Sequence, residues 1–396
     1  MGFGVCSRIL PGGVSINEWL LNISTLLYVI ALIGASTYLP RYAVSLGANE
    51  TSVSLLASSY AATSIPLRLV VGVLSDKGYA KVIMISGSIL GSIACLLYMV
   101  SSSLEPIYMG RLIHGASVAL FIPASLYSAS ISGEMASRAI LWRSLMWSLG
   151  FIVGPSVFGV ALSIGSWGLV YILAIVFSIA SAGISVFYRL PRIYARPREK
   201  GGGLLSASFT LASASLFFYI VGYQSISYFL PALHEVRGLS AFETAMFFTL
   251  MAITSLASRL ALIAVREQDP WATAITGSIA SIAGYMLIAS NPEGSIAIIS
   301  ATIAGAGMGL LFPSLQIISL LGVPEHRRGA ASSIYTAMFD LGALIGPPTI
   351  ITISGGYRNA IERSAIAVTV TAPLILAIKL IGSLKTRSES KITRYE

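Results

Sequence analysis

Twelve long apolar stretches constrain this chain of 396 residues more than any other feature of its sequence. Each is long enough to cross about 30 Å of hydrocarbon, and in lipid each must be helical because unpaired strand edges cannot be hydrated there. Hydrophobic residues make up 55% of the chain and charged residues only 10%, which excludes an ordinary cytosolic enzyme. We therefore predict an all-α membrane protein with transmembrane helices over 19–42, 50–74, 82–103, 106–132, 138–163, 167–188, 204–233, 240–265, 271–289, 294–321, 329–353 and 361–384.

The basic residues fix the expected orientation of these spans. Eighteen of the 25 lie in breaks or span ends on one predicted side, whereas four lie on the other. The positive-inside rule places both termini in the cytoplasm, and we expect a multi-pass protein of the plasma membrane. The net charge of +9 is thereby explained as an orientation signal, so no nucleic-acid partner is expected. Cys6 and Cys95 form neither a disulfide framework nor a metal site.

The chain divides near its midpoint into two related halves. A basic, glycine-rich break at 189–203 separates an expected bundle over 19–188 from one over 204–384, with cytoplasmic segments at 1–18 and 385–396. A repeat at an offset of about 190 residues aligns 63–69 with 254–260 and 150–155 with 342–347. Because each half has six spans, both halves enter the membrane in the same direction. Two pseudo-symmetric six-helix bundles of this kind are typical of a transporter whose halves rock about a central site.

Three motifs at the second, fourth and fifth spans carry a family resemblance. They are Gly72-Val-Leu-Ser-Asp-Lys-Gly-Tyr-Ala-Lys81, Arg111-Leu-Ile-His-Gly115 and Gly150-Phe-Ile-Val-Gly-Pro155. With the repeat, they resemble the loop, R-x-x-x-G and antiporter signatures of the major facilitator superfamily. The resemblance implies the twelve-helix fold of that family and secondary transport by alternating access.

The resemblance also implies gating and coupling residues. In this family the position of Asp76 faces the start of the eleventh helix, and Lys77, Lys81, Glu134 and Arg138 would complete a charge network there; ordinary loop charges are the alternative. Glycines spaced four apart permit close helix packing, and prolines bend helices, so the repeated Gly-Pro motifs are candidates for packing or for gating. These motif residues are Gly150, Gly154, Pro155, Gly346 and Pro347.

Ionisable residues inside spans are costly and are functional candidates by default. They are Arg68, Arg111, His114, Arg143, Arg259 and Asp340. Arg68 and Arg259 are repeat equivalents, which favours an architectural or gating role, although monocarboxylate transporters have a substrate-binding arginine at a place similar to Arg259. Arg111 and His114 lack counterparts and share one face of the fourth helix, so each is a candidate for the substrate pathway or for structural packing.

The excess of buried positive charge favours an organic or inorganic anion as solute. A sugar-like solute and a cationic or hydrophobic drug remain alternatives, but the first span reads Ile33-Gly-Ala35 where drug/proton antiporters place an acid. Asp340 either carries a coupling proton or pairs with Arg68 as a lock. Aromatic and polar residues expected to complete the pathway are Tyr28, Tyr219, Tyr223 and Gln224.

Two other classes of function are alternatives to transport. A membrane-embedded enzyme would need a catalytic motif or a long loop, and the sequence offers neither; a transporter-like sensor would bind without flux. We expect no catalysis, no cofactor and no metal. The expected partners are membrane lipid, a small solute and, as a candidate coupling ion, the proton, with the chain acting as a monomer.

Overall fold

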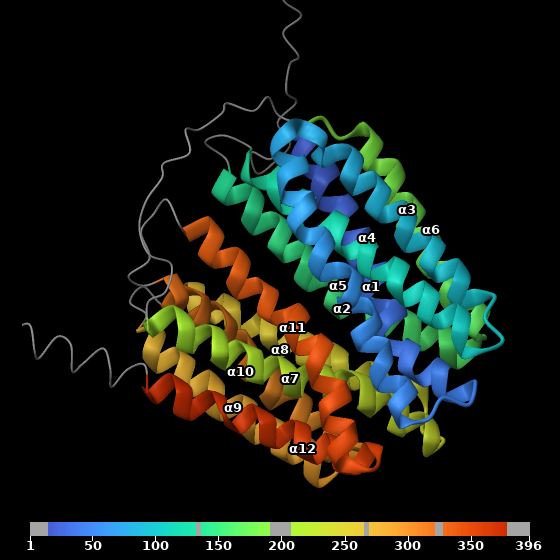
Figure 1. Ribbon diagram of the computed structural model, residues 1–396, viewed down its shortest axis with the longest axis vertical. Coiled ribbons are helices and arrows are strands. Elements are labelled where there is room, and N and C mark those ends of the chain that lie inside the picture. Colours follow the sequence, from blue (N-terminus) through green and yellow to red (C-terminus); the bar gives the residue numbers. More distant parts are fainter. Residues whose placement is uncertain (1–14, 132–135, 191–206, 265–268, 321–327, 378–396) are drawn as a thin grey trace, which may run out of the picture. The chain divides into compact units, whose positions relative to one another are not determined.

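The computed structural model describes residues 15–131, 136–190, 207–264, 269–320 and 328–377, and these ranges are almost entirely helical (Figure 1). Twelve helices are long and apolar enough to cross a membrane, which confirms the predicted all-α fold and the number of spans. The α-helices are α1 (Ile16–Ser45), α2 (Glu50–Leu74), α3 (Ala80–Met99), α4 (Leu104–Ser130), α5 (Ala136–Ile164), α6 (Trp167–Phe187), α7 (Ala207–Val236), α8 (Ala241–Ala264), α9 (Pro270–Ser290), α10 (Gly294–Leu320), α11 (Arg328–Ser354) and α12 (Tyr357–Thr369).

Several helices begin outside the apolar stretch that predicted them. The first starts at Ile16 instead of residue 19, because Ser15 and Glu18 form a capping box that satisfies free backbone N–H groups. Helix α9 begins with Pro270 behind the Asp269 cap, whose carboxylate accepts from the Trp271 amide at 2.9 Å. In α1 and α9, hydropathy therefore indicates the apolar part of the helix, and the capping residues set its first residue.

The junction of α2 and α3 is a kink. The short segment η1 (Ser75–Tyr79) joins the two helices there. Gly78 has a φ of 89°, a conformation that residues with a Cβ rarely adopt. This glycine explains how the chain reverses direction within the loop motif.

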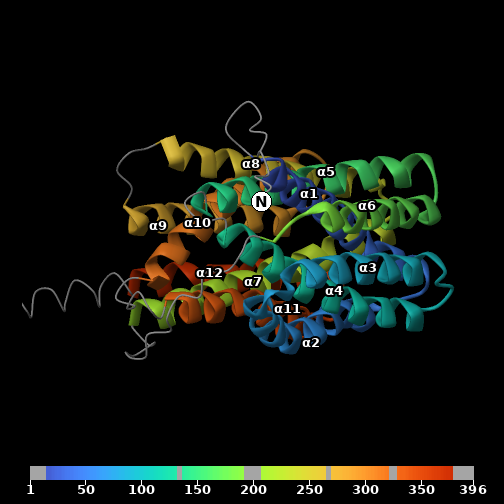
Figure 2. The same cartoon turned by 90° about the horizontal axis from the view of Figure 1, so that it is seen from above.

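The chain folds into two compact units. One consists of 1–47 and 59–195, the other of 48–58 and 196–396. In the first unit α3 lies against α4 and α6, and in the second α9 lies against α10 and α12 (Figure 2). The predicted linker 189–203 lies mostly outside the described residues, so its boundaries stay a prediction.

The internal repeat is visible as repeated packing inside each unit. A Cβ placed on Gly115 of α4 would collide with the Tyr60 carbonyl and the Thr63 hydroxyl of α2. A Cβ on the equivalent Gly305 of α10 would collide with the backbone of α8 and with the hydroxyl of Thr254, the repeat partner of Thr63. The two halves thus use one glycine–threonine crossing each to bring two backbones together.

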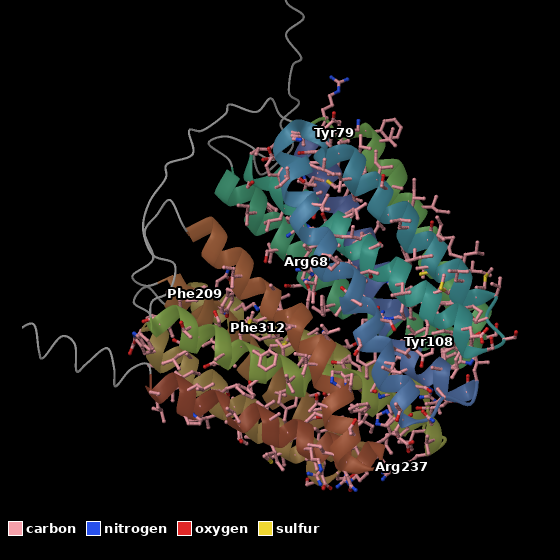
Figure 3. All side chains as sticks on the ribbon, viewed as in Figure 1. Arg68, Tyr79, Tyr108, Phe209, Arg237 and Phe312 are labelled. Atoms are coloured by element: carbon pink, nitrogen blue, oxygen red, sulfur yellow. The ribbon has the colours of Figure 1, made fainter. Side chains whose placement is uncertain are left out.

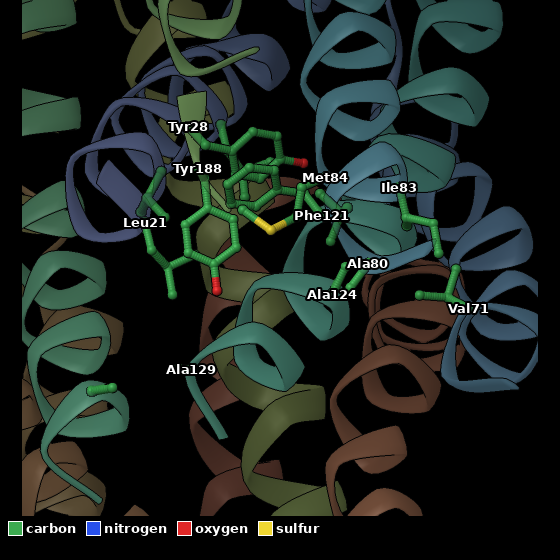
Figure 4. Packing of buried hydrophobic residues seen from close by; sticks show 14 residues of the cluster. Leu21, Tyr28, Val71, Ala80, Ile83, Met84, Phe121, Ala124, Ala129 and Tyr188 are labelled. Atoms are coloured by element: carbon green, nitrogen blue, oxygen red, sulfur yellow. The ribbon is translucent and has the colours of Figure 1, made fainter. Parts of the chain in front are cut away.

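The core of the first unit combines aromatic stacking with buried hydroxyl groups (Figure 4). The ring of Tyr28 stacks on Phe121 with 3.8 Å between centroids. Ser117 donates its hydroxyl hydrogen to the Gly87 carbonyl at 2.7 Å. Because a serine hydroxyl has only one hydrogen, the Tyr28 hydroxyl is the donor in its 2.8 Å bond to Ser117. These bonds join α1, α3 and α4 and leave the three polar groups satisfied in an apolar setting.

In each unit a hydrogen bond connects the first helix to a short loop. In the first unit the Tyr42 hydroxyl donates to the Ser101 carbonyl at 2.8 Å. In the second, His234 Nε2 lies 3.0 Å from the Pro292 carbonyl and Nδ1 lies 2.8 Å from the Thr244 hydroxyl. Because a carbonyl only accepts, Nε2 carries the hydrogen of this histidine. Both units therefore fasten their first helix to the loop between their third and fourth helices.

The glycine crossing generates a stability prediction. Gly115→Val should lower the stability of the folded protein by about 1–3 kcal/mol or more, because the side chain would overlap the backbone of α2. Thermal unfolding of the purified protein in detergent measures the change. Gly183→Val is the matched control, since Gly183 lies on α6 with open space around it. Equal melting temperatures for the two variants would contradict this account of the crossing.

Candidate functional site

Arg111 and His114 lie together in the interior of the first unit. Both are on α4 and each is 2% exposed. The guanidinium of Arg111 stands over the Tyr60 ring of α2, 4.6 Å from its centroid, in a cation–π contact. His114 Nδ1 and the Tyr98 hydroxyl of α3 share a hydrogen bond of 3.2 Å. Both residues are held by aromatic neighbours, and their role in the substrate pathway stays a prediction.

The aromatic neighbours continue as a cluster through the unit. Tyr98 lies 5.5 Å from Tyr171 of α6, Tyr171 lies 5.3 Å from Tyr42 of α1, and Tyr42 lies 4.8 Å from Trp167, measured between ring centroids. The Tyr171 hydroxyl is fully buried and has no hydrogen-bond partner among the described residues. Sequence reasoning missed this cluster because Tyr42, Tyr98 and Tyr171 come from three different helices, and no spacing along the chain connects these three residues.

Arg68 of α2 and Arg259 of α8 occupy equivalent places in the two units, each five residues after the threonine of the helix crossing. The two arginines differ in their hydrogen bonds. Arg68 Nε donates to the Ser64 hydroxyl at 3.3 Å, whereas the buried Nε of Arg259 has no hydrogen-bond partner among the described residues. Arg259 therefore has a buried donor that no described residue uses.

A row of aromatic rings passes through the second unit. Tyr219 of α7 shares a 3.1 Å hydrogen bond with the hydroxyl of Tyr285 on α9. Its ring meets Phe312 of α10, labelled in Figure 3, edge to face at 5.1 Å. Phe312 meets Phe339 of α11 in the same way at 5.3 Å. The predicted residue Tyr223 stacks beside Tyr219 at 6.4 Å, and Gln224 follows it on α7, half-buried. Phe312 and Phe339 were missed because phenylalanine is ordinary in a membrane helix.

Arg143 fastens α5 to α4. Its Nε donates to the Ser125 hydroxyl at 3.0 Å and its Nη2 to the Ile122 carbonyl at 3.1 Å, and its guanidinium lies 5.8 Å from the Trp147 ring. A buried arginine is stable in such a place only when its donors are satisfied. These contacts assign Arg143 a bracing role within the first unit.

The predicted gating residues are only partly described. Asp340 is 3% exposed on α11. Lys77 is exposed and Lys81 is half-buried. Glu134 and the side chains of Asp76 and Arg138 lie outside the described residues, so the proposed charge network stays a prediction.

The Gly-Pro motifs are packing surfaces. A Cβ on Gly150 would meet the Val29 side chain at 2.5 Å, and one on Gly154 would meet the Gly34 amide at 3.0 Å, both on α1. In the second unit Gly342 and Gly346 lie equally close to Ile220 and Val221 of α7. The carbonyl of Pro155 accepts from the Tyr38 hydroxyl at 2.8 Å. The glycines serve close packing, and a gating role for Pro155 and Pro347 stays a prediction.

The motifs, the repeat and the two helical units agree with a single family. Residues 21–347 match the Major Facilitator Superfamily. The chain belongs to this superfamily. Membership gives the family and leaves the class of solute open.

Individual relatives are distant. A protein of Yersinia enterocolitica, named as a candidate multidrug resistance protein, is 22% identical over 189 residues, which are 47% of this chain and 40% of that protein. The chain thus spans well under half the length of this relative. The nucleoside transporter NupG has a similar fold, with a TM-score of 0.70 and 16% identity over 91% of this chain and 98% of NupG. The human organic anion transporter MFSD10 also has a similar fold, with a TM-score of 0.64 and 15% identity over 90% of this chain and 98% of MFSD10.

The contrast between Tyr98 and Tyr171 makes a testable prediction. Tyr98→Phe should destabilise the protein by about 1–3 kcal/mol, because it leaves a buried nitrogen of His114 without this partner. Tyr171→Phe, in the same cluster, should leave stability unchanged or raise it, because its hydroxyl has no partner among the described residues. Melting temperatures in detergent compare the two. Equal losses would refute the assigned bond.

Proposed function

We propose that the protein is a secondary active transporter that moves a small anionic solute across a membrane by alternating access. Family membership and the repeated packing of its two helical units support transport. We further propose a plasma-membrane location with both termini cytoplasmic, a monomeric state and protons as the coupling ion. Catalysis forms no part of this proposal.

The observation that carries the anion assignment is the state of Arg259. Of the arginines within spans, Arg143 is bonded to α4 and Arg111 is stacked on Tyr60. Arg259 is half-buried, and its buried Nε has no hydrogen-bond partner among the described residues. A guanidinium in a poorly screened place attracts an anion, and its fixed fork of donors suits a carboxylate or phosphate.

Alternative solutes carry less support. The name of the Yersinia relative favours a drug and that of NupG a nucleoside, while the name of MFSD10 favours an organic anion. A cationic drug would need a buried acid to offset its charge. Asp340 is the only acidic residue more than two turns from both ends of its helix in the described chain. The balance of charge within the spans therefore favours an anion.

Replacing Arg259 tests the anion proposal. Arg259→Gln should reduce anion uptake into proteoliposomes about 10–100-fold, because a charge-assisted hydrogen bond in an apolar place contributes about 1.5–3 kcal/mol. Arg237→Gln is the matched control, since Arg237 lies in the same unit but is exposed and paired with Glu293. Uptake driven by an ion gradient without product formation separates transport from catalysis, and binding without uptake would indicate a sensor. Equal anion uptake by both variants would contradict the role of Arg259.

Replacing Asp340 tests proton coupling. Asp340→Asn removes the buried carboxyl that would bind and release the proton, so uptake should lose its dependence on a pH gradient. Glu362→Gln is the control, because Glu362 is exposed and paired with Arg358. Uptake is measured in proteoliposomes with and without an imposed pH difference. An unchanged response in Asp340→Asn would leave this residue a structural role.

A further inference from the structure

We propose that the second unit selects aromatic organic anions, with Phe312 and Phe339 as the specificity-determining residues and Arg259 as the contact for the carboxylate. This inference rests on the proposed anion transport and narrows its substrate class. It follows from the ring row of α7, α10 and α11 and from the charge beside it.

The row runs from the packed core of the unit to accessible side chains. Tyr285 and Tyr219 are fully buried, with exposures of 0%. Phe312, Phe339 and Tyr223 are half-buried, so each keeps some surface that the described chain does not cover. Both contacts of Phe312 are edge to face, at interplanar angles of 77° and 74°. A ring added at the open end of such a series continues the same favourable geometry.

The positive charge lies on α8, the helix that packs against α10 at the level of Phe312. Gly305 and Gly309 of α10 meet the backbones of Met251 and Ser255 of α8 in that order, so the two helices run parallel. Arg259 follows Ser255 by one helical turn, and Phe312 follows Gly309 by three residues. A ligand that uses both features must carry an aromatic ring and an anionic group. An inorganic anion would leave the rings unused, and an aromatic cation would be repelled by the guanidinium.

The first unit does not repeat the arrangement. The alignment of Pro123 with Pro313 places Ile122 opposite Phe312. Tyr28, the partner of Tyr219, stacks on the fully buried Phe121 instead. Trp147, opposite Phe339, lies beside the guanidinium of Arg143. The row of rings is therefore present in the second unit and not in the described part of the first, as expected of residues that determine specificity.

Two matched anions test the proposal on the purified full chain. Benzoate and cyclohexanecarboxylate have the same charge and similar size, and only benzoate has an aromatic ring. Calorimetry should give benzoate an affinity about three- to tenfold higher. Inorganic phosphate and benzyl alcohol, which lack the ring and the charge respectively, should bind more weakly than benzoate. Equal affinities of the protein for benzoate and cyclohexanecarboxylate would overturn the inference.

Variants locate the preference. Phe312→Leu and Phe339→Leu should each lower the benzoate to cyclohexanecarboxylate ratio towards one, whereas Phe312→Tyr should keep it. Phe248→Leu, which breaks the separate Phe247–Phe248 pair of α8, should also keep it. If the folded Phe312→Leu and Phe339→Leu variants keep the wild-type ratio of benzoate to cyclohexanecarboxylate affinity, these two residues do not determine specificity. If a leucine variant fails to fold, the ratio of the wild-type protein decides.

Different binding results would contradict the aromatic preference and the proposed anion transport. If the protein binds both carboxylates, or phosphate, without any preference for the aromatic anion, the proposed role of the ring row in specificity is wrong. The proposal of anion transport is not contradicted by that result. Binding and uptake of a neutral or cationic solute, with none of the three anions bound, would overturn the proposed function itself.

Discussion

The absence of water in the hydrocarbon core governs the whole structure. Backbone N–H and C=O groups must be satisfied within each helix, so the chain has few ways to cross lipid other than as helices. The helices gain little from burying apolar surface, because lipid is equally apolar, and must instead approach closely. Gly115, Gly150 and their repeat partners permit this approach, since a Cβ at these positions would overlap a neighbouring helix.

The same constraint decides where polar side chains stand. Buried hydroxyl groups such as Ser117 and Tyr28 bond to each other and to a carbonyl. Arg143 and Arg111 are accommodated by α4 and by the Tyr60 ring respectively. Arg259 keeps a buried donor that is unused within the described chain. A buried hydrogen-bond donor that the fold itself does not use is available to bind a ligand.

The repeat separates scaffold from specialisation. Thr63 and Thr254, like Gly150 and Gly342, make equivalent contacts in the two units and serve the common architecture. The contacts of Arg111 with Tyr60 and of Phe312 with Tyr219 occur in one unit only among the described residues. Comparing the units within one molecule therefore distinguishes what holds the fold from what a particular solute requires.

The sequence by itself determined the twelve spans, the repeat and the family, because hydropathy, charge and motif spacing are properties of the chain read in order. It also identified Arg111, His114 and Arg259 as candidates, since charges in apolar stretches stand out. Only the tertiary structure decided their partners. Tyr60 and Tyr98, the neighbours of Arg111 and His114, come from other helices. Helices that are apolar on every side do not reveal in sequence which face meets which neighbour. Those contacts depend on how each helix is rotated about its axis, which close packing alone fixes.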